Sequence, residues 1–234
     1  NEMTVNHLWT CDREYEVTGV GYAPKGEIRS NGEKWLAADD EQLRLLVAGG
    51  ALCSNARLVD PEEEGGRYTV LGDPTEACLL VSAQKAGLTL EGLEAEMPRV
   101  RELPFESRRK RMTTIHQLKQ PLDGAKRVAF VKGAPNEVVR LSSSARINGE
   151  VVAMDNDLRK RIMDANDGYA ADGLRVLALA YRPLRADDES IPRSMSDYTP
   201  DNIECELTFV GLLVMQDPPR PEVADAIREA HDAG

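Results

Sequence analysis

The chain has 234 residues, of which 41% are hydrophobic and 29% are charged. This composition is typical of a soluble globular protein with room for one large domain or two small ones. No apolar stretch approaches the roughly 20 residues of a membrane-spanning helix, so we expect no part of the chain to be inserted in a bilayer. The net charge of −11 weighs against nucleic acid as a partner, because phosphate backbones are bound by basic surfaces.

The start of the chain and its cysteines favour a cytosolic segment. NEMTVNHLWT has no initiator Met and no basic or apolar region of a signal peptide, so we expect a boundary within a longer chain. The cysteines are dispersed and form no CxxC pair, which favours reduced structural thiols: Cys11, Cys53, Cys78 and Cys205. The histidines also lack metal-ligand spacing and should have packing or surface roles: His7, His116 and His231.

The first ninety residues predict short strands followed by two helices. Alternating apolar and polar residues in the first thirty positions predict two antiparallel strands, and an Asn-Gly pair marks the next turn. Asp39 is expected to cap a helix that extends to about Asn55. A clearer helix is predicted over GDPTEACLLVSAQKAG, with Asp73 as N-cap, Glu76 placed as in a capping box, and Gly87 at its end.

The centre of the chain predicts a meander of strands. A short acidic helix near 91–96 is followed by the runs VRELPF, MTTIHQL and RVAFVK, each typical of a strand. Pro135 should begin a helix that ends near Leu141. RINGEVVAM then has the pattern of a hairpin around an Asn-Gly turn.

The last third adds one long helix and two strands. Asp155 should cap a helix that ends at Gly173, and the apolar run LRVLALAYR predicts a central buried strand. A linker over about 183–202, the strand ELTFVGLLVM and a final amphipathic helix complete the chain. Hairpin-type connections predominate, so we predict an α+β fold with a mostly antiparallel twisted sheet flanked by helices.

Common catalytic motifs are absent from the sequence. It contains no phosphate-binding GxxxxGKS or GxxxxGKT loop and no GxGxxG, GxSxG or HExxH motif. VAFVK resembles the strand lysine of a protein kinase, but no glycine-rich loop precedes it and no HRD or DFG follows. These absences exclude the kinase interpretation.

Five short segments carry a family resemblance: GDPTEA, PFESRRKRM, FVKGAP, GLRVLALA and DPPRPEV. In this order they resemble P-type ATPases of the second class, the family of calcium, sodium/potassium and related pumps. NEMTV resembles the stretch after that family's phosphorylated DKTGTLT motif, and LCSNA resembles a segment between the first two blocks. The resemblance covers the whole chain and implies the fold of the nucleotide-binding domain.

The resemblance implies that Phe105 stacks on adenine and that Glu76 lies near the adenine amino group. Each residue also has a simpler interpretation. Phe105 at a strand end is, by itself, more typical of a core residue, whereas a stacking ring would stabilise a bound base by roughly 1–3 kcal/mol. Glu76 is explained as a capping-box carboxylate, and both of its roles can hold together.

The family pattern FxSxxKxM fits Phe105, Ser107, Lys110 and Met112, and it implies Ser107 and Lys110 as nucleotide-site residues. The neighbouring arginines, which could simply form a solvated loop, are left as an unspecific positive field: Arg108, Arg109 and Arg111.

The remaining matches complete the implied site. KGAP makes Lys132 the strongest candidate, with Gly133 allowing the ligand to approach closely; otherwise Lys132 would extend to solvent. The resemblance places Arg175 near the phosphates, although a surface role is the simpler interpretation. Leu177 lies on the same strand face and would form an apolar wall. Asp217 and Arg220 flank two prolines and match one of the hinges to the phosphorylation domain; by themselves they indicate a stiff linker.

The resemblance also predicts the domain organisation and the activity of the longer protein. Residues 1–216 are expected to form the nucleotide-binding domain with an N-terminal hinge segment, and 217–234 the hinge and first helix of a truncated phosphorylation domain. The parent pump would use ATP, as Mg-ATP, at the cytosolic face of a membrane and transfer the γ-phosphoryl to an aspartate. Its partners would be ATP or ADP and the phosphorylation and actuator domains.

The 234 residues lack the DKTGTLT aspartate, so we expect them to bind nucleotide without hydrolysing it. Calcium is the favoured transported ion, with sodium, potassium, magnesium and manganese as alternatives. Two other classes remain open. One is a non-enzymatic interaction domain of the same fold, and the other is a phosphohydrolase cap domain, which would need its own aspartate nucleophile.

Overall fold

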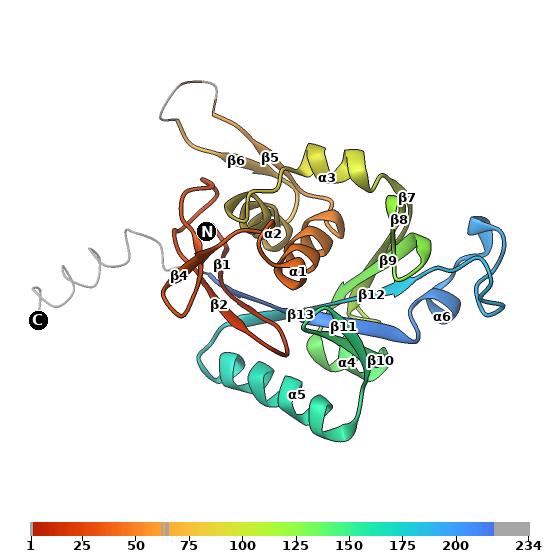
Figure 1. Ribbon diagram of the computed structural model, residues 1–234. Helices are drawn as coiled ribbons and strands as arrows, with labels where there is room; N and C mark the ends of the chain where they lie inside the picture. The colour runs from red at the N-terminus through yellow and green to blue at the C-terminus, as the bar shows by residue number, and fades with distance from the viewer. Residues whose placement is uncertain (1, 62, 64–65, 218–234) are drawn as a thin grey trace, which may run out of the picture.

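A computed structural model describes residues 2–61, 63 and 66–217. Within these residues a large sheet has helices packed on both of its faces (Figure 1). Eleven strands form the sheet: β1 (Thr4–Trp9), β2 (Glu14–Val17), β3 (Ile28–Ser30), β4 (Glu33–Trp35), β7 (Arg99–Glu106), β8 (Arg111–Leu122), β9 (Ala125–Gly133), β10 (Ser142–Ile147), β11 (Glu150–Ala153), β12 (Arg175–Pro183) and β13 (Leu207–Gln216).

The sheet is almost entirely antiparallel. Its main order is β4-β3-β2-β1-β13-β12-β9-β8-β7, and β10 joins β13 in parallel while pairing β11 in a hairpin. The predicted meander is confirmed as β7-β8-β9, and the apolar run LRVLALAYR is the central strand β12. The predicted α+β architecture is therefore confirmed.

Alternation along the strands separates two hydrophobic cores. Phe130 and Leu179 face one side of the sheet, which is covered by α1 (Glu41–Leu52), α2 (Pro74–Lys85) and α3 (Leu90–Glu96). Val131 and Ala178 face the other side, which is covered by α4 (Pro135–Leu141) and α5 (Asn156–Ala171). The first side is called the α1 face below, and the second the α5 face.

A third core lies on the α5 face of the meander. The segment between β12 and β13, predicted as a plain linker, contains a 3-10 turn (Met195–Asp197) and α6 (Pro200–Ile203). Four side chains of this segment form the core with one residue each from β7, β8 and β9. The segment contributes Leu184, Ile191, Tyr198 and Ile203, and the strands contribute Leu103, Ile115 and Ala129. This segment is therefore a packed part of the domain.

Several local predictions need correction. The two antiparallel strands predicted in the first thirty residues are confirmed as β2 and β3, but β1 and β4 on either side of them were missed. The N-cap of α1 is Asp40, whose carboxylate accepts from the amides of Gln42 and Leu43, whereas Asp39 accepts from the amide of Leu36. The sequence analysis also missed the separate hairpin of β5 (Arg57–Val59) and β6 (Thr69–Leu71).

Other predictions are confirmed. Asp73 caps α2 with Pro74 in the first turn, and Gly87 follows the helix with a φ of +86°. Asp155 caps α5. The cysteines are free thiols, and Cys205 is the most exposed of them.

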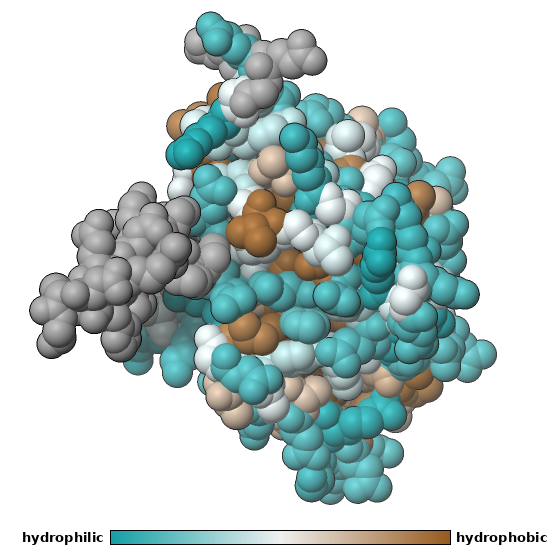
Figure 2. Space-filling view, turned by 90° about the vertical axis from the view of Figure 1, so that its left-hand side faces the viewer, coloured by the Kyte–Doolittle hydropathy of each residue, from teal (hydrophilic) through white to brown (hydrophobic). Residues whose placement is uncertain are grey.

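On the side shown in Figure 2, hydrophobic residues form small separate patches in a mostly hydrophilic surface. Among the described residues, no helix is both long and apolar enough to cross a membrane.

Candidate functional site

Lys132 lies at the end of β9 and is 5% exposed. Strand pairing places it between Met112 of β8 and Leu179 of β12, so its side chain lies on the α1 face. Its ammonium donates to Ser54 Oγ and to Glu76 Oε1, each at 3.1 Å. Within the described part of the chain, these two acceptors use two of its three N–H groups. The simpler interpretation, a lysine that extends to solvent, is therefore wrong.

Glu76 is placed by α2 so that its carboxylate bridges two other elements. Oε1 accepts from Lys132, and Oε2 accepts from the backbone amide of Asn55 at 2.7 Å. The predicted capping-box role is wrong, because both oxygens of this carboxylate accept from groups outside α2. The contact between Glu76 and Lys132 joins two residues that are 56 positions apart in the sequence.

Arg99 of β7 fixes the segment that receives Glu76. Its guanidinium donates to the carbonyls of Leu52 at 2.6 Å and Ser54 at 2.5 Å, and to Asn55 Oδ1 at 2.5 Å. A cation at this position satisfies carbonyl groups at the C-terminal end of α1. The sequence analysis did not single out Arg99, Ser54 or Asn55. Ser54 and Asn55 lie in the segment LCSNA, which resembles a family segment, but that resemblance implied no role for either residue.

Phe105 is 62% exposed, so the alternative that it belongs to the core is wrong. Phe105 lies where the register of β7 against β8 shifts, between Leu103 and Glu106. The next residue, Glu106, pairs with Arg111, and Arg111 neighbours Met112, which pairs with Lys132. Phe105 is therefore one residue from the Glu106–Arg111 pair, which adjoins the Met112–Lys132 pair.

The turn after Phe105 is closed by backbone hydrogen bonds. The amide of Lys110 donates to Glu106 O at 2.7 Å, and Lys110 O accepts from the amide of Ala134 at 2.9 Å. Lys110 has a φ of +53°, and its side chain is exposed, as is that of Ser107. The turn therefore presents both predicted polar residues to solvent.

Gly133 packs closely against the turn that carries Lys110. A Cβ atom built there would lie 2.5 Å from Lys110 O and 2.5 Å from the Cβ of Arg111. Glycine at this position therefore lets the turn close against β9. The expectation that Gly133 also serves the approach of a ligand stays a prediction.

Arg175 and Leu177 lie two residues apart in β12 and share the α1 face, as predicted. Arg175 is exposed, and its Nη1 donates to Thr75 Oγ1 at 2.9 Å. Leu177 is half-buried and packs against the core on that face. Thr75 directly precedes Glu76, so this contact brings Arg175 to the same end of α2.

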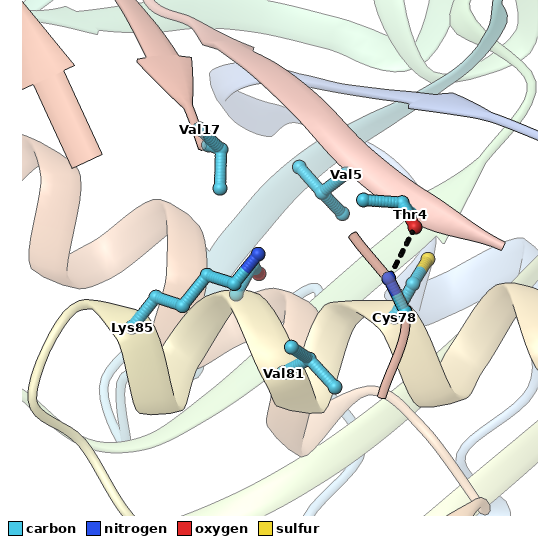
Figure 3. A pocket seen from close by; sticks show the side chains of 8 residues that line it. Thr4, Val5, Val17, Cys78, Val81 and Lys85 are labelled. Atoms are coloured by element: carbon cyan, nitrogen blue, oxygen red, sulfur yellow. Dashed lines mark hydrogen bonds between the residues drawn. The ribbon is translucent and has the colours of Figure 1, made fainter. Parts of the chain in front are cut away.

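A second buried lysine lies at the other end of α2. Lys85 is 6% exposed and borders a small pocket lined by Thr4, Val5, Val17, Gly21, Cys78, Val81 and Ser82 (Figure 3). Its ammonium donates to the carbonyls of Thr18 at 2.8 Å and Gly19 at 3.0 Å, and burial lowers its pKa. Burial also raises the pKa of the Cys78 thiol to about 12. These contacts hold the loop that follows β2.

The fold and this geometry define the class of domain. On the α1 face, Lys132 of β9 contacts Glu76 of α2, and Arg175 of β12 contacts Thr75 at the same end of α2. The exposed ring of Phe105 lies near the end of β7. Asp217 is described, whereas Arg220 and the predicted final helix lie outside the described residues. No group of three or more His, Cys, Asp or Glu side chains able to hold a metal ion occurs in the described ranges.

The chain belongs to the P-type ATPase family, because the model of the P-type ATPase cytoplasmic domain N matches residues 42–222. It is 35% identical over 234 residues to a calcium-transporting ATPase of Bacillus subtilis, covering 100% of this chain and 25% of that protein. It is 35% identical over 246 residues to the cation-transporting ATPase pma1 of Synechocystis, covering 100% and 24%.

A calcium-transporting ATPase type 2C member 1 from Bos taurus is 31% identical over 230 residues, covering 97% of this chain and 21% of that protein. The chain therefore spans about a quarter of the length of the first two relatives. Its resemblance to P-type ATPases, expected from the short motifs, is confirmed.

Proposed function

We propose that this domain binds ATP and ADP and positions the nucleotide for a P-type cation-transporting ATPase. The main supporting observation is the exposed ring of Phe105, which is one residue from the Glu106–Arg111 strand pair and so lies near the end of β9 that carries Lys132 and its partner Glu76. A base stacked on this ring would cover apolar surface that is otherwise in contact with water. The family assignment supports this ligand over other planar molecules.

The residues fit the parts of a nucleotide. Phe105 would stack on adenine, and Glu76 would accept from its amino group. Lys132, Lys110 and Arg175 would supply positive charge and donors, with Ser107 as a polar neighbour and Leu177 as an apolar wall. Gly133 would contribute by letting the turn that carries Lys110 close. Such a small set of contacts suits a modest affinity near ~1 mM, which corresponds to about 4 kcal/mol.

In the longer protein, residues 1–216 would deliver the nucleotide to a phosphorylation domain, with 217–234 as the hinge and its first helix. Holding the γ-phosphoryl near an aspartate converts their encounter into an intramolecular step. Magnesium bound with the nucleotide would neutralise phosphate charge in that reaction. The phosphorylation and actuator domains would be the partners, at the cytosolic face of a membrane. Calcium is the transported ion that we favour from the names of the relatives.

The 234-residue chain is expected to bind nucleotide without turnover, because the DKTGTLT aspartate is not in the sequence. The competing function is an interaction domain of the same fold without nucleotide affinity. Titration of the chain with ATP, followed by calorimetry or NMR chemical shifts, separates the two. Absence of a saturable response at several millimolar ATP would overturn the proposal.

Phe105→Ala tests the location of the site. Loss of stacking should weaken ATP binding by roughly 1–3 kcal/mol, whereas the melting temperature should change little because the ring is 62% exposed. Leu71→Ala is a matched control, since Leu71 is 66% exposed and lies in the separate β5–β6 hairpin. The control should leave ATP affinity unchanged. Equal affinities of the wild type and Phe105→Ala would show that the site is misplaced.

A further inference from the structure

Glu204 is a buried acid that no sequence motif singled out. Its side chain is 0% exposed, and it lies between α6 and β13. Oε1 accepts from Arg109 Nη1 and from Thr113 Oγ1, the latter at 2.8 Å, and Oε2 accepts from Arg111 Nε at 2.6 Å. A carboxylate with two guanidinium partners and a hydroxyl partner is well compensated for its burial.

The three donors reach Glu204 from the α5 face of the meander. Arg111 and Thr113 are two residues apart in β8 and therefore point to the same side. Met112 lies between them and points to the opposite side, where it pairs with Lys132. Glu204 thus contacts β8 on the face of the sheet opposite to Lys132.

Arg109 contacts both Glu204 and the residues on either side of Phe105. Its Nη2 donates to Pro104 O at 2.6 Å, and its Nε donates to Glu106 Oε2 at 3.0 Å. Arg111 Nη1 in turn donates to Arg109 O at 2.9 Å. The guanidinium of Arg109 therefore connects Glu204 with the two neighbours of the exposed ring. These contacts show that Arg109 and Arg111 have specific partners, so the prediction that they form only an unspecific positive field is wrong for these two residues.

We propose that Glu204 is a positioning residue for the nucleotide site. It fixes, through Arg109 and Arg111, the turn that carries Phe105, Ser107 and Lys110. Phe105 is largely exposed and has little packing of its own, so its direction depends on the backbone at Pro104 and Glu106. Residue 204 is 95 positions from Arg109 along the chain, and its carboxylate lies on the face of the sheet opposite to Lys132. This inference rests on the proposed function.

Glu204→Gln is the first test, because the amide keeps the size of the side chain and removes its charge. ATP affinity, measured by calorimetry on the full 234-residue chain, should fall roughly threefold to tenfold, as for other changes within one hydrogen-bonded network. Glu206→Gln is the matched control. Glu206 is in the same segment, its side chain is 69% exposed, and it contacts Arg182. The control should bind ATP as the wild type does.

A double-mutant cycle distinguishes positioning from a general loss of stability. If Glu204 acts by placing Phe105, then Glu204→Gln should lose most of its effect on ATP affinity in a Phe105→Ala background. An effect of the same size in both backgrounds would overturn the proposal. Wild-type affinity in Glu204→Gln, with Phe105→Ala impaired, would also overturn it while leaving the proposed function intact. A wild-type chain that does not bind ATP would instead contradict the proposed function.

Arg109→Lys keeps the test decisive if Glu204→Gln does not fold. Lysine preserves the charge, but it cannot contact Glu204, Glu106 and Pro104 O together as the guanidinium does. The side chain of Arg109 is 16% exposed, so this change is milder than one at Glu204. Reduced ATP affinity that disappears in the Phe105→Ala background would support the proposal, and unchanged affinity would overturn it.

Discussion

Lys132 and Lys85 are buried to nearly the same extent, at 5% and 6% exposure, but they have different partners. Lys132 contacts the side chains of Ser54 and Glu76. Lys85 contacts two backbone carbonyls of the loop that follows β2. Burial alone therefore does not identify a ligand-binding lysine.

The kind of partner distinguishes the two regions. Side-chain acceptors such as Glu76 can change rotamer and exchange a protein contact for a ligand contact. Backbone carbonyls can do so only if the loop itself moves. We therefore expect Lys132 to affect nucleotide affinity and Lys85 to affect stability. Variants of the two lysines test that division, and a buried histidine gives a reference for the cost of burying a base.

The largest expected effect is that of His116, a buried base to which no ligand contact is assigned. Its titration shows how much burial of a base lowers the free energy of unfolding at acidic pH. His116 is 0% exposed, and its Nδ1 donates to Met97 O at 2.8 Å. Burial lowers its pKa from 6.5 to about 4. Between these values the unfolded chain binds a proton that the folded chain does not. The free energy of unfolding should therefore fall as the pH drops from 6.5 to 4, by about 3 kcal/mol in total.

His116→Gln should flatten this pH dependence, because the amide does not titrate. Urea unfolding at several values between pH 4 and 7 measures the slope. His7→Gln is the control for removal of an imidazole, since the side chain of His7 is 33% exposed. An unchanged slope in His116→Gln would show that other groups cause the loss of stability in acid.

Lys85→Met should lower the free energy of unfolding by about 2 kcal/mol, because the carbonyls of Thr18 and Gly19 lose their donor. ATP affinity should stay unchanged. Lys85 and Glu76 are nine residues apart on α2, which places them about 13 Å apart along the helix. Denaturant unfolding and calorimetry on the same sample measure both quantities. Weaker ATP binding at unchanged stability would assign function to the pocket in Figure 3.

Lys132→Met should give the reverse pattern. ATP affinity should fall about tenfold, or about 1.4 kcal/mol, through loss of a positive charge and a donor. Stability should change less than in Lys85→Met, because Glu76 keeps the amide of Asn55 as a partner. Lys126→Met is the matched control in the same strand, where Lys126 is exposed. Loss of stability with unchanged affinity would give Lys132 the same structural role as Lys85.

The sequence predicted those elements whose signals are local. The N-cap of α2 at Asp73, the meander and the hairpin at 147–150 depend on caps, alternation and turn residues within a few positions. Asp39 was predicted as the N-cap of α1 where the structure has Asp40, because two neighbouring acids are equally good caps by sequence. The segment over 183–202 was predicted as a linker because its apolar residues have no regular period.

The site could be predicted only as a set of separate residues. Short motifs selected Glu76, Phe105 and Lys132, but nothing in the sequence indicated that Glu76 contacts Lys132 and Asn55 instead of closing a capping box. The sequence also did not indicate that the turn carrying Lys110 packs closely against Gly133. Each of these facts depends on strand register, which places residues far apart in the sequence side by side.

The amino-acid sequence by itself determined the α+β class, the family and the residue types available for a ligand, because periodicity, capping and motif order are written along the chain. Only the tertiary structure decided which of two buried lysines faces exchangeable partners and which acid lies behind the Phe105 turn. Glu204 and Arg109 are separated by 95 positions, and neither has a local pattern that identifies the other. Their contact follows from the long segment between β12 and β13 folding back over the meander, where burial of its apolar residues fixes it.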